Sequence, residues 1–167
     1  MPRTARFLKN NVCYHAIARA QRERKAFKEE SDYFYYLRLL KRYKSKLEIN
    51  IFGFCFLPEC VHLILQPFEA KNLSYFMQRL SQSYTIYSNK KYRQHGRLWQ
   101  GRLRSVALNH DEDLFECIKY VEFIPVRMNL TNSSVEYAWS SCSFRILGYS
   151  NSILDGRPMA KEGLLKY

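Results

Sequence analysis

The spacing of hydrophobic and polar positions changes several times along the first half of the chain, and each change predicts a new element. Residues 12–19 alternate between two faces, which is the period of a β-strand. In residues 29–47 apolar side chains recur at helical spacing, with basic residues on much of the opposite face. Residues 48–56 and 61–66 are dense in aliphatic and aromatic side chains and are separated by a Leu-Pro-Glu break. They predict a β-hairpin at the centre of a sheet.

The second half of the chain predicts a long helix, a strand and a final helix. Residues 72–92 carry an apolar stripe at helical spacing, and a basic loop punctuated by glycines follows. Residues 102–108 predict a strand, and residues 109 or 111 to about 123 predict a helix that Pro125 ends or bends. The resulting order of strand, helix, two strands, helix, strand and helix indicates an α+β fold, in which helices pack on an antiparallel sheet.

Length and composition predict one globular domain over residues 1–167, with an irregular tail over residues 150–167. A chain of 167 residues can bury a core without disulfide or metal staples, and a hydrophobic share of 47% argues against disorder. No apolar run approaches the roughly 20 residues of a membrane-spanning helix. The first dozen residues also lack the apolar stretch of a signal peptide. We therefore expect a cytoplasmic protein with no membrane partner.

The five cysteines form no CxxC pair and lie mostly in apolar segments. This distribution is typical of reduced, buried side chains, and it lacks the spacing of a zinc ribbon or a redox motif. The five are Cys13, Cys55, Cys60, Cys117 and Cys142.

Net charge is the strongest compositional indication of function. The formal charge is +12 and the isoelectric point is about 9.6, which favours a polyanionic partner. Tyr43, Tyr92 and Trp99 are interleaved with the basic residues, a mixture that suits single-stranded nucleic acid because cations neutralise phosphates while aromatic rings stack on unpaired bases. The alternative is a solvated helix face beside core aromatics. Two stretches without acids carry the charge: Arg38, Lys41, Arg42, Lys44 and Lys46, then Lys90, Lys91, Arg93, Arg97, Arg102 and Arg104.

Five short segments, taken in their order along the chain, carry a family resemblance. They are YHAIARA (14–20), FCFLPECVHLIL (54–65), RLWQGRLRS (97–105), KYVEFIPVR (119–127) and YAWSS (137–141). Together they resemble the single-tyrosine HUH transposases, especially the branch associated with repetitive extragenic palindromes. The resemblance covers most of the chain and implies an HUH-nuclease fold with a ferredoxin-like arrangement.

The resemblance implies a specific DNA chemistry. In this family a tyrosine oxygen attacks a phosphodiester of single-stranded or hairpin DNA, leaving a 5′-phosphotyrosine link and a free 3′-hydroxyl, and rejoining is the reverse reaction. A divalent ion, Mg or Mn, polarises the phosphate. Two of its ligands come from a histidine-hydrophobe-histidine triplet on a strand, and the third comes from a polar side chain one helical turn beyond the tyrosine.

Carried over residue by residue, the family pattern is met in part. Tyr120 matches the nucleophile and His62 the second histidine of the triplet. Cys60 stands at the first-histidine position, and Ile124 stands where related sequences usually carry asparagine. A thiolate is a soft ligand that favours zinc or copper over magnesium, and isoleucine offers no ligand atom. One of the three expected ligands is therefore present.

Three other residues could compensate for the missing ligands. Glu122 lies two residues from Tyr120 on the same predicted helix and should point away from it, so we interpret it as a surface or salt-bridged acid. His15 lies on a strand that could neighbour the strand of His62, and we interpret it as a hydrogen-bonded core histidine. Glu59, next to the triplet, could lend a carboxylate oxygen.

The basic loop between the matched segments holds the predicted DNA contacts. Arg97, Arg102 and Arg104 are the best candidates for phosphate binding, because an arginine offers a fixed bidentate fork. Trp99 and Trp139 could stack on bases, but large aromatic side chains more often anchor the fold.

Three hypotheses about function follow. The first is an active transposase that nicks and rejoins single-stranded DNA through Tyr120. The second, favoured by the changes at Cys60 and Ile124, is a DNA-binding derivative of such an enzyme whose catalysis is weak or lost. The third is an RNA-binding α+β module, which would leave the ordered segments unexplained. Either DNA-binding protein could act as a monomer or as a homodimer.

Overall fold

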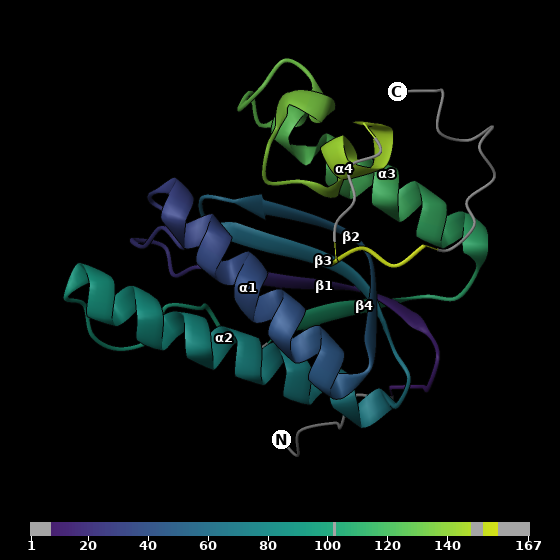
Figure 1. Ribbon diagram of the computed structural model, residues 1–167, viewed down its shortest axis with the longest axis horizontal. Helices are drawn as coiled ribbons and strands as arrows, with labels where there is room; N and C mark the ends of the chain where they lie inside the picture. Colours follow the sequence, from purple (N-terminus) through teal and green to yellow (C-terminus); the bar gives the residue numbers. More distant parts are fainter. Residues whose placement is uncertain (1–7, 102, 148–151, 157–167) are drawn as a thin grey trace.

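A computed structural model describes residues 8–101, 103–147 and 152–156. It contains a four-stranded sheet in the order β2-β3-β1-β4, in which every neighbouring pair is antiparallel. The α+β fold predicted from the sequence is confirmed (Figure 1). The elements are β1 (Cys13–Arg19), α1 (Glu30–Leu47), β2 (Ile49–Leu57), β3 (Cys60–Pro67), α2 (Ala70–Tyr92), β4 (Arg104–Leu108), α3 (Asp111–Arg127), the 3-10 helix η1 (Ser134–Glu136) and α4 (Ser141–Leu147).

The alternation in β1 gives the sheet two different faces. Tyr14, Ala16 and Ala18 pack into a large core beneath α1 and α2. Cys13 and Ile17 belong to a smaller cluster beneath α3. Figure 1 shows α1 and α2 side by side on one side of the sheet, with α3 and α4 on the other. Any site on the α3 side is thus separated by the sheet from the long helices.

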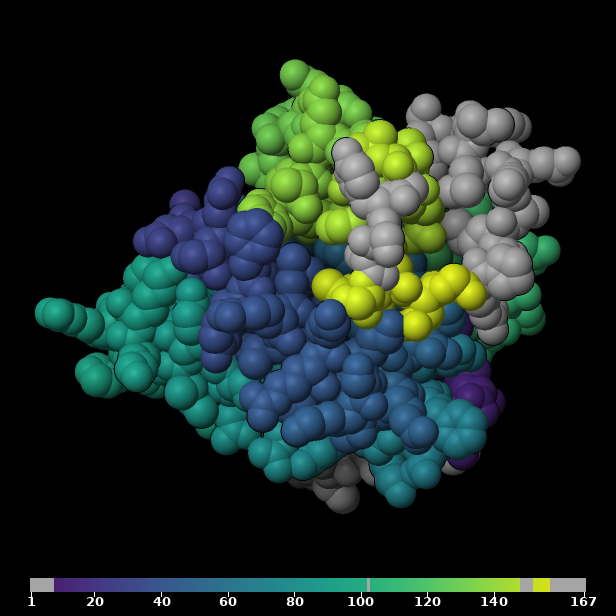
Figure 2. Space-filling view, in the orientation of Figure 1, coloured from purple at the N-terminus to yellow at the C-terminus, as the bar shows by residue number. Residues whose placement is uncertain are grey.

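The larger core is dominated by aromatic rings. Tyr36 and Tyr84 are fully buried with ring centroids 5.0 Å apart, and the Tyr36 ring lies 5.1 Å from Phe56 of β2. Such pairs add to the free energy of burial through their edge-to-face geometry. Figure 2 shows α1 and α2 forming much of the surface on this side of the molecule.

The turn between β2 and β3 determines where the triplet Cys60-Val61-His62 begins on β3. Leu57 pairs with Cys60, which leaves Pro58 and Glu59 as the connecting residues. The Pro58 carbonyl accepts hydrogen bonds from the backbone N–H groups of Ala26 (2.7 Å) and Phe27 (3.1 Å). The turn is therefore tied to the segment after β1.

Helix α3 differs from the sequence prediction at its end. The prediction ended or bent the helix near Pro125, but the helix runs through Pro125 to Arg127. Val121, Ile124 and Pro125 are all buried, and Val121 and Ile124 pack with strand residues in the smaller cluster. This packing holds the last turn although proline lacks an N–H to donate. The backbone N–H of Met128 still bonds to the Ile124 carbonyl at 2.9 Å.

The edge of β2 is covered by Trp139 and by Ser141, the first residue of α4, which the sequence analysis did not predict. The Phe56 N–H donates to the Trp139 carbonyl (2.8 Å), and the Phe54 N–H donates to Ser141 Oγ (3.0 Å). Trp139 also stacks on Tyr33 with ring centroids 4.4 Å apart. The expectation that Trp139 anchors the fold is confirmed.

Most of the predicted tail, residues 150–167, lies outside the described residues. Within residues 152–156, the Asp155 carboxylate accepts a hydrogen bond from the Ile51 N–H (2.8 Å). It also forms an ion pair with Lys44 (2.7 Å). In the part of the chain that the structure describes, no helix combines the length and apolar character needed to cross a bilayer.

Candidate active site

Cys60 and His62 lie on the α3 face of β3. Because side chains alternate along a strand, they share that face with Ile64, which packs in the smaller cluster together with Cys60. Both are buried, and Cys60 Sγ lies 3.4 Å from His62 Nε2. The spacing of the triplet thus places the two side chains together, as the sequence predicted.

His15 joins these two residues from the neighbouring strand. In the antiparallel pairing of β1 and β3, Ile17 lies opposite His62, which places His15 diagonally across from it. His15 Nε2 is 3.0 Å from His62 Nδ1, and the two rings stack with centroids 5.2 Å apart. The interpretation of His15 as a hydrogen-bonded core histidine is confirmed, and its partner is the predicted site residue itself.

The electrostatic environment keeps this cluster uncharged. Burial, followed by repulsion from the protonated form of His15 and from the charges of Arg19 and Arg127, lowers the pKa of His62 to about 3. Burial also lowers the pKa of His15 and raises the pKa of the Cys60 thiol, although Arg19 beside the sulfur acts in the opposite direction on Cys60. At neutral pH the cluster consists of two neutral imidazoles and a thiol.

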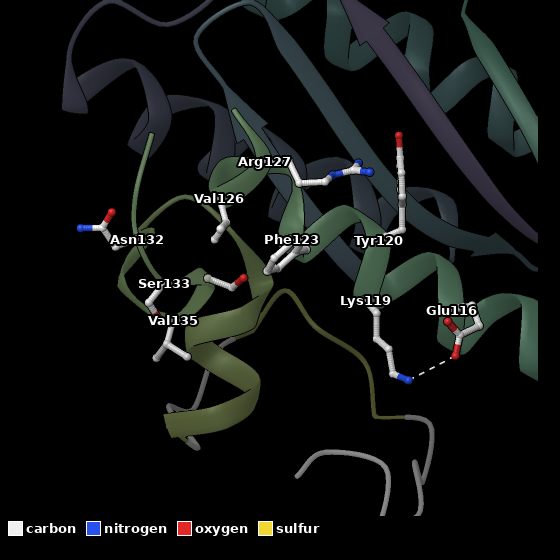
Figure 3. Close-up of a pocket in the computed structure, with 10 residues that line it drawn as sticks. Glu116, Lys119, Tyr120, Phe123, Val126, Arg127, Asn132, Ser133 and Val135 are labelled. Carbon is white, nitrogen blue, oxygen red and sulfur yellow. Dashed lines mark hydrogen bonds and ion pairs between the residues drawn. The ribbon is translucent and has the colours of Figure 1, made fainter. Parts of the chain in front are cut away.

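Helix α3 places Tyr120 above the histidines. Its side chain is 47% exposed, and its ring centroid lies 6.4 Å from that of His15. Arg127, two helical turns further on, carries its guanidinium carbon 4.3 Å from the centre of the Tyr120 ring (Figure 3). The sequence analysis missed Arg127, and the signal that could have found it is the i, i+7 spacing on one helix face.

The residues present do not fit the divalent ion that the resemblance implies. Ile124 is 6% exposed and packs in the apolar cluster, so the third ligand position is part of the core. Both ring nitrogens of His62 already face side chains of this chain, His15 on one side and Cys60 on the other. Among the described residues, no group of three or more His, Cys, Asp or Glu side chains is placed to hold a metal ion.

The two acids considered as compensating ligands lie elsewhere. Glu122 is fully buried, accepts a hydrogen bond from Ser141 (2.5 Å) and pairs with Arg145 (3.2 Å). It is salt-bridged, as one interpretation held, but in the interior rather than at the surface. Glu59 is exposed in the turn between β2 and β3.

One of the predicted phosphate-binding arginines shares the sheet face of the cluster. Arg104 of β4 pairs with Ile17 of β1, which pairs with His62 of β3, so the three form one row across the sheet. Directly paired residues point to the same face, and Arg104 is exposed. Arg97 is also exposed, whereas Arg102 lies outside the described residues.

The basic residues at the end of α2 have different surroundings. Lys91 binds the buried Asp32 (2.7 Å) and also Glu29 (3.1 Å). Lys90 and Arg93 are exposed. Trp99 donates its indole N–H to the Ser81 carbonyl (3.2 Å) and packs against the larger core, as expected of a fold anchor.

One comparison with known proteins shows the family, and another shows the fold. The family model described as "Transposase IS200 like" matches residues 8–122, a range that contains the triplet and Tyr120. The fold is similar to the solved structure of the REP-associated tyrosine transposase bound to a REP hairpin, with a TM-score of 0.76 and 15% identity over 98% of this chain and 96% of that chain. A putative transposase from Deinococcus radiodurans R1 gives a TM-score of 0.48 and 16% identity, covering 72% of this chain and 96% of that chain. No curated protein matches the chain.

Proposed function

The chain belongs to the IS200-like transposase family, and from this premise we propose that it binds single-stranded or hairpin DNA beside α3. The observation that carries the proposal is the position of Tyr120, which is half-exposed above the buried His15–His62 pair and in contact with Arg127. Arg104 on the same face of the sheet adds a second cation. The similar REP-associated transposase was solved with a REP hairpin, which supports DNA as the partner class.

If the site cleaves DNA, Tyr120 is the nucleophile. Its phenolic oxygen would form a bond to phosphorus while the bond from phosphorus to the 3′-oxygen breaks, giving a 5′-phosphotyrosine and a 3′-hydroxyl. Arg127 would neutralise charge on the phosphate oxygens, because its guanidinium already lies against the tyrosine ring. The phenol of Tyr120 would lose a proton as this bond forms, and the departing 3′-oxygen would gain one to become the hydroxyl, so the step needs no net proton source. His15, whose ring centroid lies 6.4 Å from that of Tyr120, is the nearest ring of the cluster.

The second candidate function is a DNA-binding derivative whose cleavage is weak or lost. The residues at the expected metal-ligand positions favour this second function. Ile124 is in the core, and the Cys60 sulfur is a buried thiol with a raised pKa. Mg or Mn, the ions that the family implies, prefer oxygen ligands and gain little from such a thiol. We therefore propose that binding is retained and that metal-dependent cleavage is weak. In either case the protein would act in the cytoplasm, as a monomer or a homodimer.

Cleavage of a labelled hairpin DNA with a single-stranded extension, in the presence of Mg or Mn, separates the two candidates. The natural protein is compared with Tyr120→Phe and with the double variant Cys60→His, Ile124→Asn. A covalent adduct that Tyr120→Phe abolishes would establish an active transposase. Cleavage by the double variant alone would establish a binding derivative.

An RNA hairpin of the same sequence serves as competitor. RNA that binds more tightly than DNA would favour the RNA-binding module and contradict both DNA-based functions. Failure of the natural protein to bind any of the DNA hairpins would contradict the proposal as a whole.

A further inference from the structure

A pocket of about 600 Å³ opens directly beside Tyr120. It lies between α3 and the segment that follows it, and a volume in this range is typical of small-ligand sites. Its lining residues come from two stretches, Glu116, Lys119, Tyr120, Phe123, Val126 and Arg127 of α3, and Asn132, Ser133, Ser134 and Val135 after it.

The interior of the pocket is aromatic and aliphatic. Phe123 is 46% exposed, and its ring lines the pocket one turn before the end of α3. Figure 3 shows Phe123 and Val126 facing the segment that carries Ser133 and Val135. The exposed aromatic surface is therefore gathered in a concave site.

Positive charge lies at the end of the pocket nearest Tyr120. The Arg127 guanidinium crosses from the last turn of α3 to the Tyr120 ring. Lys119 also lines the pocket but is paired with Glu116 at 3.1 Å, so Arg127 is the cation with the freer charge. Asn132, which is exposed, and Ser133, which is half-buried, line the pocket from the segment after α3.

We infer that this pocket binds one unpaired nucleobase of the DNA, the base next to the phosphate held at Tyr120. The base would stack on Phe123, its edge would meet the polar groups of Asn132 and Ser133, and its phosphate would bind Arg127. An aromatic ring, polar edge partners and a cation at one end match the parts of a nucleotide. The inference rests on the proposed DNA binding and adds a site that selects one base position.

The test uses fluorescein-labelled hairpin DNA with a single-stranded extension, and a series in which one base of the extension at a time is replaced by an abasic site. For the natural protein, one position should stand out, and loss of its base should weaken binding about 5-fold or more. Phe123→Ala should weaken binding of the intact DNA by a similar factor and should show no further loss on the DNA lacking that base. Phe123→Trp should retain tight binding.

Phe68→Ala is the matched control, because Phe68 is 60% exposed and lies in the turn between β3 and α2. It should bind intact DNA as the natural protein does. Equal sensitivity of Phe123→Ala and the natural protein to every abasic site would overturn the inference while leaving DNA binding intact. Absence of binding by the natural protein itself would overturn the proposed function and the inference together. Thermal unfolding of each variant checks that it is folded.

Discussion

His15 Nε2 lies 3.0 Å from His62 Nδ1, so two histidines from neighbouring strands share one hydrogen bond. Such a bond requires one ring to donate and the other to accept, and it is lost when both rings are protonated. Since the other nitrogen of His62 faces the Cys60 sulfur, this imidazole is held from both sides. His62 is therefore a buried residue whose ring is held in place by His15 and Cys60.

Replacing Ile124 by asparagine should destabilise the fold. The side chain is buried in an apolar cluster, and the change combines lost apolar burial with an amide that lacks partners there. We expect the free energy of unfolding to fall by about 2–4 kcal/mol, measured by urea denaturation. Met128→Asn, at an exposed position just after α3, is the control and should cost less than about 1 kcal/mol. An equal cost for both variants would contradict the burial argument.

Arg127→Gln should weaken DNA binding about 3- to 10-fold at low salt, because a charge-assisted contact to phosphate is lost. Fluorescence anisotropy with labelled single-stranded DNA measures the effect. Arg38→Gln is a matched control, because Arg38 also lies over a tyrosine ring, that of Tyr35, at 5.2 Å but on α1 across the sheet. Arg38→Gln should show only the smaller loss of DNA affinity that follows from removing one positive charge from the protein. Equal losses for the two variants would indicate that the position of Arg127 is unimportant.

The triple variant of Arg97, Arg102 and Arg104 to alanine should reduce the salt dependence of binding. Each phosphate contact to single-stranded DNA contributes about 0.7 to the slope of log affinity against log salt, so the slope should decrease by up to about 2. The control is the triple alanine variant of Lys41, Arg42 and Lys46, which are exposed on α1. The prediction fails if affinity and slope are unchanged in the loop variant, or if the α1 variant loses as much.

Asp32→Asn should destabilise the protein in a pH-dependent way. Burial by itself raises the pKa of Asp32, but hydrogen bonds from Lys91, Tyr92 and the backbone N–H groups of Lys28 and Glu29 outweigh it, so the pKa lies below the usual 3.8. We expect a loss of about 3 kcal/mol, because a buried charge network is broken. A depressed pKa means that the stabilisation is present above pH 3.8 and lost as pH falls toward the folded-state value.

Urea unfolding of natural and Asp32→Asn protein across pH tests this sign. The difference between them should be constant from about pH 5 to pH 8 and should shrink in stronger acid. Gln82→Ala, at an exposed position of α2 outside this network, should have a small effect at every pH. A difference that grows in acid would contradict the assignment of the charge to Asp32.

The elements of the sheet could be predicted because their patterns are local. The alternation in β1 and the Pro58–Glu59 break between two apolar runs determine strand positions to within a residue or two. The helix α4 was missed, because seven residues without strong periodicity form a helix here only through tertiary contacts such as that of Arg145 with Glu122.

The sequence could predict only those features of the site that one strand or one helix determines by itself. The side chains of Cys60 and His62 share a face because of strand geometry, and Tyr120 lies on a helix as the segment pattern indicated. The contact of His15 with His62 depends on the register between β1 and β3, which no local pattern specifies. The pocket at Phe123 depends on the path of residues 132–135 after α3, and the sequence carries no signal for that path.

The segment that covers β2 has a consequence for self-association. With the Phe56 N–H already bound by Trp139, a second copy cannot add a strand along this part of β2. Strand addition to the sheet would have to use β4, whose exposed Arg104 is the kind of charged side chain that disfavours pairing between sheet edges. The same positive charge attracts a polyanion to the β4 edge.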